Sequence, residues 1–224
     1  MKAVLYLAPL LALTVFLLVR AEILKIRRQI YVFKPISTLI VIAVALLSFL
    51  EPTRNLAYSV GVLVGLILSF GGDVALMFQE HRKAFMLGLV LFLLAHVAYT
   101  VVFVVLGRFS GWDTLSTLLL LLAGVSFYRL IRPNLGTMRM PVLVYILVIS
   151  AMVSRAASTL ASPAFTGAQA MMVIVGAVLF YISDLILAAA RFWRPWKYNR
   201  ISLVFYYSGQ LLIALTASYF GTSG

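Results

Sequence analysis

The chain has 224 residues, of which 64% are apolar and only 11% are charged, and its mean hydropathy is +1.10. Soluble domains are about half apolar and a quarter charged, so this composition excludes an ordinary soluble domain and is typical of a membrane protein. The lack of cysteine excludes disulfide bonds and thiolate metal sites. The net charge of +12 would suit a nucleic-acid-binding protein. However, the 18 Lys and Arg residues lie almost wholly in short segments between apolar runs, which argues against nucleic acid as a partner.

Apolar segments of spanning length, about 17–25 residues, follow one another along the chain. In hydrocarbon every backbone amide needs a partner within its own segment, so we expect these segments to be helices. The predicted fold is therefore an all-α, polytopic transmembrane bundle of eight helices in a single integral membrane domain, residues 1–224. The predicted helices lie near Val4–Val19, Phe33–Leu50, Leu56–Phe78, Ala84–Leu106, Thr114–Leu130, Met140–Ala157, Ala168–Ala190 and Ile201–Phe220.

The first apolar segment is predicted to be a retained helix. Only Lys2 precedes it, whereas four basic residues follow it between Arg20 and Arg28. A signal peptide has the opposite charge order and ends at a small-residue cleavage site, which does not stand out here.

The distribution of basic residues predicts the orientation of the helices. The connections after the first, third, fifth and seventh helices contain fourteen Lys and Arg residues, and the opposite side contains four. Positive charge favours the cytoplasmic side, so we expect these four connections in the cytoplasm, both termini outside, and the chain in the inner (cytoplasmic) membrane. The fourteen are Arg20, Lys25, Arg27, Arg28, Lys34, Arg82, Lys83, Arg129, Arg132, Arg139, Arg191, Arg194, Lys197 and Arg200, and the four are Lys2, Arg54, Arg108 and Arg155.

Two helices carry similar sequences. Val64–Leu76 aligns with Val175–Leu187 at an offset of 111 residues, and Val, Gly, Leu, Asp and Leu coincide. Because four helices separate the two segments, their halves would point the same way. The alignment predicts a parallel four-plus-four internal repeat.

Asp73 and Asp184 are the predicted functional residues, and they occupy equivalent positions of this repeat. The other four acidic residues of the chain lie in connections or at helix ends. A charge at the bilayer centre costs about 2.5–3.5 kcal/mol, so a carboxyl group inside an apolar helix normally faces the protein interior and has a function. Counting from the nearest helix ends places both residues roughly 8–10 Å inside the cytoplasmic boundary. Small neighbours, Gly71, Gly72 and Ser183, would let a helix or a substrate approach closely.

Other polar residues fall in the cytoplasmic half of the predicted bundle, and we expect them to contribute to one substrate pocket. For Lys34, at the expected start of the second helix, snorkelling to headgroups is the alternative. For His96, in the middle of the fourth helix, a packing role is the alternative. Arg155 is expected near the outer end of its helix, apart from this pocket. The predicted substrate-binding residues are Lys34, His96, Tyr181, Asn199, Arg200, Tyr207 and Gln210.

The sequence offers little support for a metal ion, another cofactor or a nucleophilic serine. There is no His-x-x-x-His or Glu-x-x-His spacing, and no Gly-x-Ser-x-Gly elbow. We therefore predict no cofactor.

These motifs, taken together, resemble the YhhN family of lysoplasmalogenase-like membrane proteins. The similarity extends over nearly the whole chain, and its specificity lies in the two Asp motifs and the Tyr-Gln helix. The matching segments are Lys34-Pro35, Phe70–Met77, His96 with Tyr99, Gly176–Ala188 and Tyr206–Ile213.

The resemblance implies hydrolysis of the vinyl ether bond of a lysoplasmalogen, a lysophospholipid, to a fatty aldehyde and a glycerophospho-headgroup. Two Asp residues suit this chemistry, because one protonated carboxyl group can protonate the alkene carbon while a carboxylate stabilises the resulting cation and activates water. Glycosidases use paired carboxyl groups around a similar cation. Lys34, Arg200 or other basic residues could hold the phosphate.

Two alternatives remain open at this point. Paired intramembrane Asp residues and parallel repeats also suit a proton-coupled transporter of a small solute or lipid. A non-enzymatic scaffold in contact with membrane lipids would use the Asp residues only for packing.

Overall fold

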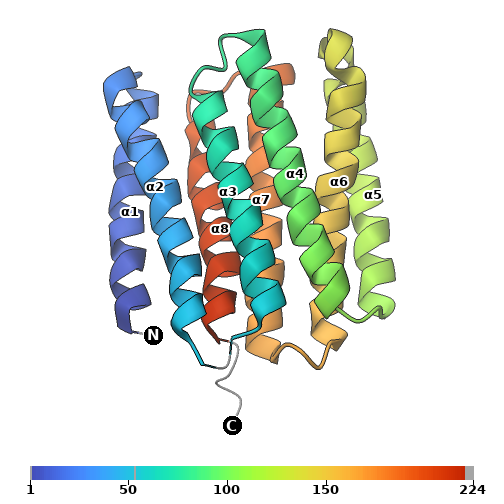
Figure 1. The fold of residues 1–224 in the computed structure, drawn as a ribbon. Coiled ribbons are helices and arrows are strands. Elements are labelled where there is room, and N and C mark those ends of the chain that lie inside the picture. The colour runs from blue at the N-terminus through green and yellow to red at the C-terminus, as the bar shows by residue number, and fades with distance from the viewer. Residues whose placement is uncertain (1, 53, 220–224) are drawn as a thin grey trace.

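The structure is a computed structural model that describes residues 2–52 and 54–219. This part of the chain forms eight α-helices and no strand, which confirms the predicted all-α bundle (Figure 1). All eight are long and apolar enough to cross a membrane. The helices are α1 (Lys2–Ile23), α2 (Arg27–Leu47), α3 (Leu56–Leu76), α4 (Arg82–Leu106), α5 (Gly111–Ile131), α6 (Arg139–Ala157), α7 (Gly167–Phe192) and α8 (Ser202–Tyr219). Short 3-10 helices, named η1 (Ser48–Leu50), η2 (Arg132–Asn134), η3 (Gly136–Met138), η4 (Ser158–Ala161) and η5 (Asn199–Ile201), lie between them.

Successive helices run in opposite directions, and the connections alternate between the two ends of the bundle. Figure 1 shows the α1–α2, α3–α4, α5–α6 and α7–α8 connections at one end, which we call the basic end. The start of α1 and the end of α8 lie at the opposite end, which we call the terminal end. The predicted alternation of the basic connections therefore matches the arrangement of the helices.

Helix starts at the terminal end are fixed by side-chain caps. The Asn55 side chain accepts a hydrogen bond from the Tyr58 amide (3.1 Å) before α3. Capping boxes start α5, with Ser110 and Asp113, and α7, with Thr166 and Gln169. Each cap supplies acceptors for backbone amides that the first helical turn leaves without partners.

The first two helices are longer than predicted. We expected them to end at Val19 and to begin at Phe33, because the basic residues between these positions resemble a loop. In the structure α1 continues to Ile23 and α2 begins at Arg27, and the turn between them contains Lys25 in a left-handed conformation (φ 57°). Charged residues thus extend both helices beyond their apolar cores. Lys34, predicted at the start of the second helix, lies seven residues inside α2.

Helix pairs pack in the same order in both halves of the chain. In the first half, α1 packs on α2 and α3 packs on α4. In the second, α5 packs on α6 and α7 packs on α8. This correspondence suits the predicted four-plus-four repeat, which stays a prediction.

Two glycines let α7 and α8 approach backbone to backbone. A Cβ atom on Gly209 would lie 2.6 Å from the Gly176 carbonyl oxygen, and one on Gly176 would lie 2.8 Å from the Gly209 carbonyl oxygen. Both distances are far below van der Waals contact, so these glycines set the spacing of the helix pair that carries Asp184.

Replacing Gly209 by Ala is expected to push α7 and α8 apart and to lower the free energy of unfolding by about 1–3 kcal/mol. The measurement is thermal denaturation of the purified protein in detergent. Gly167→Ala is the matched control, because a Cβ atom there meets nothing within 4 Å. Equal melting temperatures for the two variants would contradict the close approach.

Candidate functional site

A cavity in the basic half of the bundle is lined by several polar side chains. Its empty volume, including the part that is open to the outside, is about 1150 Å³, and its walls are mostly apolar. Both Asp73 and Asp184 line it, together with Lys34, Tyr181 and Arg200. Every helix contributes to the wall, for example through Glu22 (α1), Lys34 (α2), Asp73 (α3), Phe92 (α4), Phe127 (α5), Tyr145 (α6), Asp184 (α7) and Tyr206 (α8).

Asp73 lies near the end of α3 and is held by donors from α2 and α8. Thr38 donates a hydrogen bond to its Oδ2 atom (2.7 Å), and so does the Tyr206 hydroxyl (2.8 Å). The Lys34 ammonium lies 3.5 Å from Oδ1. The side chains of Asp73 and Lys34 are only 3% and 8% exposed, so the carboxylate and the ammonium compensate each other's charge away from water.

Asp184, on α7, has a different set of neighbours. The Tyr145 hydroxyl on α6 donates a hydrogen bond to its Oδ2 atom (2.6 Å). The His96 Nε2 atom on α4 lies 3.6 Å from the same oxygen, which is beyond hydrogen-bonding distance. The His96 ring is fully buried and packs against Phe180 and Tyr145, with ring centroids 4.7 and 5.3 Å apart. Neither ring nitrogen has a hydrogen-bond partner among the described residues.

Aromatic rings fill the space beside the two carboxyl groups. Phe92, Phe180 and Tyr206 pack edge to face, with ring centroids 5.1–6.3 Å apart. Gly72 makes room for this cluster, because a Cβ atom there would lie 2.7 Å from the Phe92 ring. The small residue before Asp73 thus lets the Phe92 ring pack closely against α3.

The remaining predicted residues lie at different distances from the cavity. Asn199 lines a neighbouring cleft at the basic end, and Arg200 lines both spaces. Tyr207 is buried behind Asp73, where its hydroxyl donates to the Lys34 carbonyl (3.1 Å). Gln210 is buried and accepts a hydrogen bond from Tyr99 (2.8 Å), away from the residues that line the cavity.

Three polar partners of the two Asp residues were not among the predicted site residues. Thr38 follows Lys34 by four residues and shares its helix face, a spacing that pointed to it. Tyr206 is adjacent in sequence to Tyr207, one of the predicted residues, on α8. Tyr145 is an isolated tyrosine in an apolar helix, and the sequence carries no signal for its contact with Asp184.

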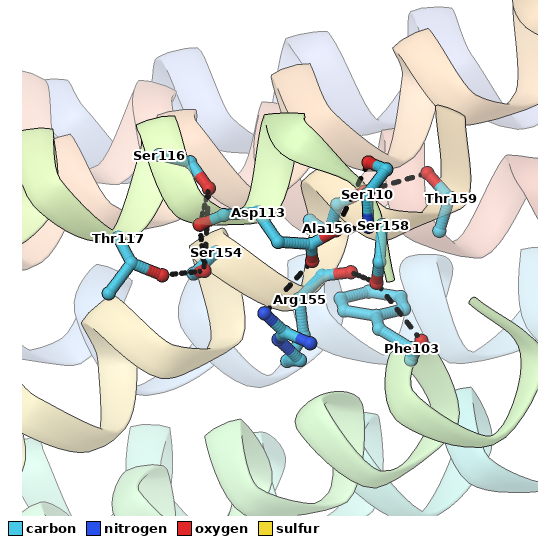
Figure 2. A network of polar contacts seen from close by, with 10 residues as sticks. All are labelled: Phe103, Ser110, Asp113, Ser116, Thr117, Ser154, Arg155, Ala156, Ser158 and Thr159. Atoms are coloured by element: carbon cyan, nitrogen blue, oxygen red, sulfur yellow. Dashed lines mark hydrogen bonds and ion pairs between the residues drawn. The ribbon is translucent and has the colours of Figure 1, made fainter. Parts of the chain in front are cut away.

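A second ion pair lies at the terminal end, apart from this cavity. Arg155 on α6 contacts Asp113 of the α5 capping box (2.9 Å), and hydroxyl groups of both helices extend the network (Figure 2). For example, Thr117 and Ser154 lie 2.7 Å apart, Oγ1 to Oγ. Arg155 was expected near the end of its helix and apart from the pocket, and in the structure it lies near the end of α6 with Asp113 as its partner.

Replacing Arg155 by Met is expected to lower the free energy of unfolding by about 2 kcal/mol, because the fully buried Asp113 loses its cation. We expect a smaller loss of stability than for a fully buried ion pair, because the Arg155 side chain is 23% exposed. Denaturation in detergent measures it, with Arg54→Met at the same end as the control. The prediction fails if the two variants are equally stable.

Among residues 2–52 and 54–219, no three His, Asp or Glu side chains gather closely enough to hold an ion. What the cavity does bring together is a carboxylate beside a cation, a second carboxyl group beside a phenol, and apolar walls. Such a set can transfer protons to and from an apolar molecule.

Comparisons with known proteins identify a family and a relative of this chain. The model of the YhhN family matches residues 29–217, a range that includes both Asp residues. The lysoplasmalogenase TMEM86A of cattle (Bos taurus) is 33% identical over 162 residues, which cover 70% of this chain and 64% of the relative. The chain thus spans less than two thirds of that protein. No solved structure matches. The match over most of the chain confirms the resemblance seen in the motifs, and the protein belongs to the YhhN family.

Proposed function

We propose that the protein is a membrane-embedded hydrolase that cleaves the vinyl ether bond of a lysoplasmalogen. The products are a fatty aldehyde and a glycerophospho-headgroup. The observation that carries the proposal is the mostly apolar cavity that both Asp73 and Asp184 line, with Lys34 and Arg200 among its polar residues. The lysoplasmalogenase name of the cattle relative supports the same reaction.

The neighbours of the two carboxyl groups support different roles for them. Asp73 has a lysine ammonium and two hydroxyl donors, which are suitable partners for a carboxylate. Asp184 has one hydroxyl donor and, among the described residues, no Lys or Arg within 4 Å. We therefore assign Asp184 as the acid and Asp73 as the carboxylate, and Tyr145 as a positioning residue for Asp184.

In the proposed reaction, protonated Asp184 transfers its proton to the alkene carbon farther from the ether oxygen. This step gives an oxocarbenium ion, which the Asp73 carboxylate stabilises. Asp73 takes a proton from water as the water oxygen bonds to the cationic carbon, and a hemiacetal forms. The hemiacetal hydroxyl returns a proton to Asp184, and Asp73 protonates the leaving glycerol oxygen. One water molecule is consumed and both residues regain their starting forms.

The cavity walls suit the apolar part of such a substrate. Phe85, Phe92, Phe127, Ile146 and Ile149 contribute apolar surface to the cavity. The glycerophospho part would lie toward the basic end, where Lys34 and Arg200 supply positive charge. The substrate would therefore span the cavity from its apolar walls to its charged end.

The direct test is an assay of the purified protein in detergent with three lysolipids that share one headgroup. A vinyl ether lysolipid should release aldehyde, whereas the saturated ether should not react, because it has no alkene carbon to protonate. The ester tests whether the protein acts as a general lysolipase. Absence of aldehyde from the vinyl ether would contradict the proposal, and proton-coupled uptake in sealed vesicles would then favour a transporter.

We also propose that the basic end faces the cytoplasm across the inner (cytoplasmic) membrane, with both termini outside. The excess of Lys and Arg in the connections at this end supports the orientation. A reporter that is active only in the cytoplasm should be silent after Gly224 and active when inserted between Arg194 and Lys197. The reverse pattern would contradict the orientation.

A further inference from the structure

A partly buried ion pair lies at the charged end of the cavity, and the proposed function gives its acidic member, Glu22, no role. The Nε atom of Arg200, in η5, lies 3.1 Å from a carboxylate oxygen of Glu22, near the end of α1. The two side chains are 29% and 11% exposed, respectively. An ion pair at this position gains little stability over apolar residues of the same size, so its presence calls for a reason other than folding.

The ion pair separates two spaces. The cleft at the basic end, which we call the vestibule, has an empty volume of about 1630 Å³. Glu22 and Arg200 line both the cavity and the vestibule, as do Leu76 and Gln79, so the two spaces adjoin at these residues. A molecule that crosses this shared wall passes beside Glu22 and Arg200.

The ion pair also lies at a suitable distance from the carboxyl groups for a headgroup. Arg200 precedes Tyr206, a donor to Asp73, by six residues across the junction of η5 and α8, roughly 9–10 Å along the axis. An extended lysoplasmalogen spans a similar length from its alkene to its phosphate oxygens, so a vinyl ether held beside Asp73 places its phosphate near Arg200. The ammonium group that follows the phosphate in a zwitterionic headgroup then lies near Glu22.

We propose that Glu22 and Arg200 together read a zwitterionic headgroup, in which Arg200 binds the phosphate and Glu22 binds the ammonium. This inference rests on the proposed function, because it takes a lysophospholipid as the ligand. Each side chain exchanges its partner in the ion pair for a ligand group of the same sign, so no charge is left uncompensated. A headgroup that bears only a phosphate would separate Glu22 from Arg200 without replacing its cation. Anionic lysolipids are therefore disfavoured.

The experiment measures binding rather than cleavage. The probes are two saturated-ether lysolipids of equal chain length, one with a phosphoethanolamine and one with a phosphoglycerol headgroup. Their dissociation constants are measured by calorimetry for the purified full chain in neutral detergent. Wild type should prefer phosphoethanolamine by about tenfold or more. Glu22→Gln should bring the ratio close to one, and Glu22→Lys should reverse it.

Further variants separate recognition from folding. Arg200→Gln should weaken the binding of both lipids, because both carry a phosphate. Glu51→Gln, in the α2–α3 connection at the terminal end, is the matched carboxylate-to-amide control and should keep the wild-type ratio. The double variant Glu22→Gln/Arg200→Gln removes both charges, so it should keep the thermal stability of wild type and lose the preference.

Two results would overturn the inference: equal binding of both lipids by wild type, or an unchanged ratio in Glu22→Gln. Neither depends on hydrolysis, because the saturated ethers are not cleaved. Aldehyde release without a headgroup preference would remove only the inference. A preference without aldehyde release would remove only the proposed reaction.

Discussion

Replacing Asp184 by Asn is expected to reduce aldehyde release by roughly 10²–10⁴-fold, because the amide cannot protonate carbon. The variant should still fold, since Asn keeps the size of the side chain and can accept the hydrogen bond from Tyr145. Initial rates at saturating vinyl ether lysolipid measure the loss. The binding of a saturated-ether lysolipid should change little.

The proton transfer to carbon can be followed directly by isotope incorporation. In deuterium oxide the wild-type product should carry one deuterium on the carbon next to the aldehyde. Glu80→Gln is the matched control for Asp184→Asn, because it makes the same kind of change at an exposed position paired with Arg27 outside the cavity. Full activity of Asp184→Asn, or an aldehyde without deuterium, would remove Asp184 as the acid.

Replacing Lys34 by Met should lower the free energy of unfolding by about 3 kcal/mol or more, because the buried Asp73 carboxylate loses its cation. Most of this loss should be recovered in the double variant Lys34→Met/Asp73→Asn, which has no unpaired charge. Aldehyde release should not recover, because Asp73 is proposed to stabilise the cation and to activate water. Denaturation in detergent and the aldehyde assay measure the two effects separately.

Lys197→Met is the control for this series, since it removes an exposed lysine at the same end of the bundle. It should change neither stability nor aldehyde release. If Lys34→Met is as stable as this control, the ion pair with Asp73 contributes nothing to the fold. If the double variant is active, Asp73 is not the base.

The sequence indicated the acidic residues of the cavity because a carboxyl group in an apolar helix is costly and therefore conspicuous. Tyr145 was missed for the opposite reason. A tyrosine places its ring in apolar surroundings and needs only one partner for its hydroxyl, so it does not stand out in a membrane helix. Its contact with Asp184 depends on how α6 packs on α7, which no local pattern encodes.

Helix boundaries and helix faces limited the rest of the prediction. Lys34 was predicted at a helix start because the basic residues before it resemble a loop, whereas Lys34 and Pro35 both lie within α2. Gln210 shares its half of the bundle with the cavity residues, but depth along a helix does not determine which neighbour the side chain faces. In the structure it faces Tyr99. The eight helices themselves were predictable, because apolar length alone determines them.

The position of the charged ion pair at one end of an apolar cavity has a consequence for turnover. In the proposed function, an intact lysolipid would bind the protein at two linked points, its chain and its headgroup, so that each contact raises the effective concentration of the other. Cleavage cuts the link between them. Each product would then keep only one of the two contacts, the aldehyde through its chain and the glycerophospho part through its headgroup. Each would bind more weakly than an intact lysolipid, so fresh substrate would displace both products even when they accumulate.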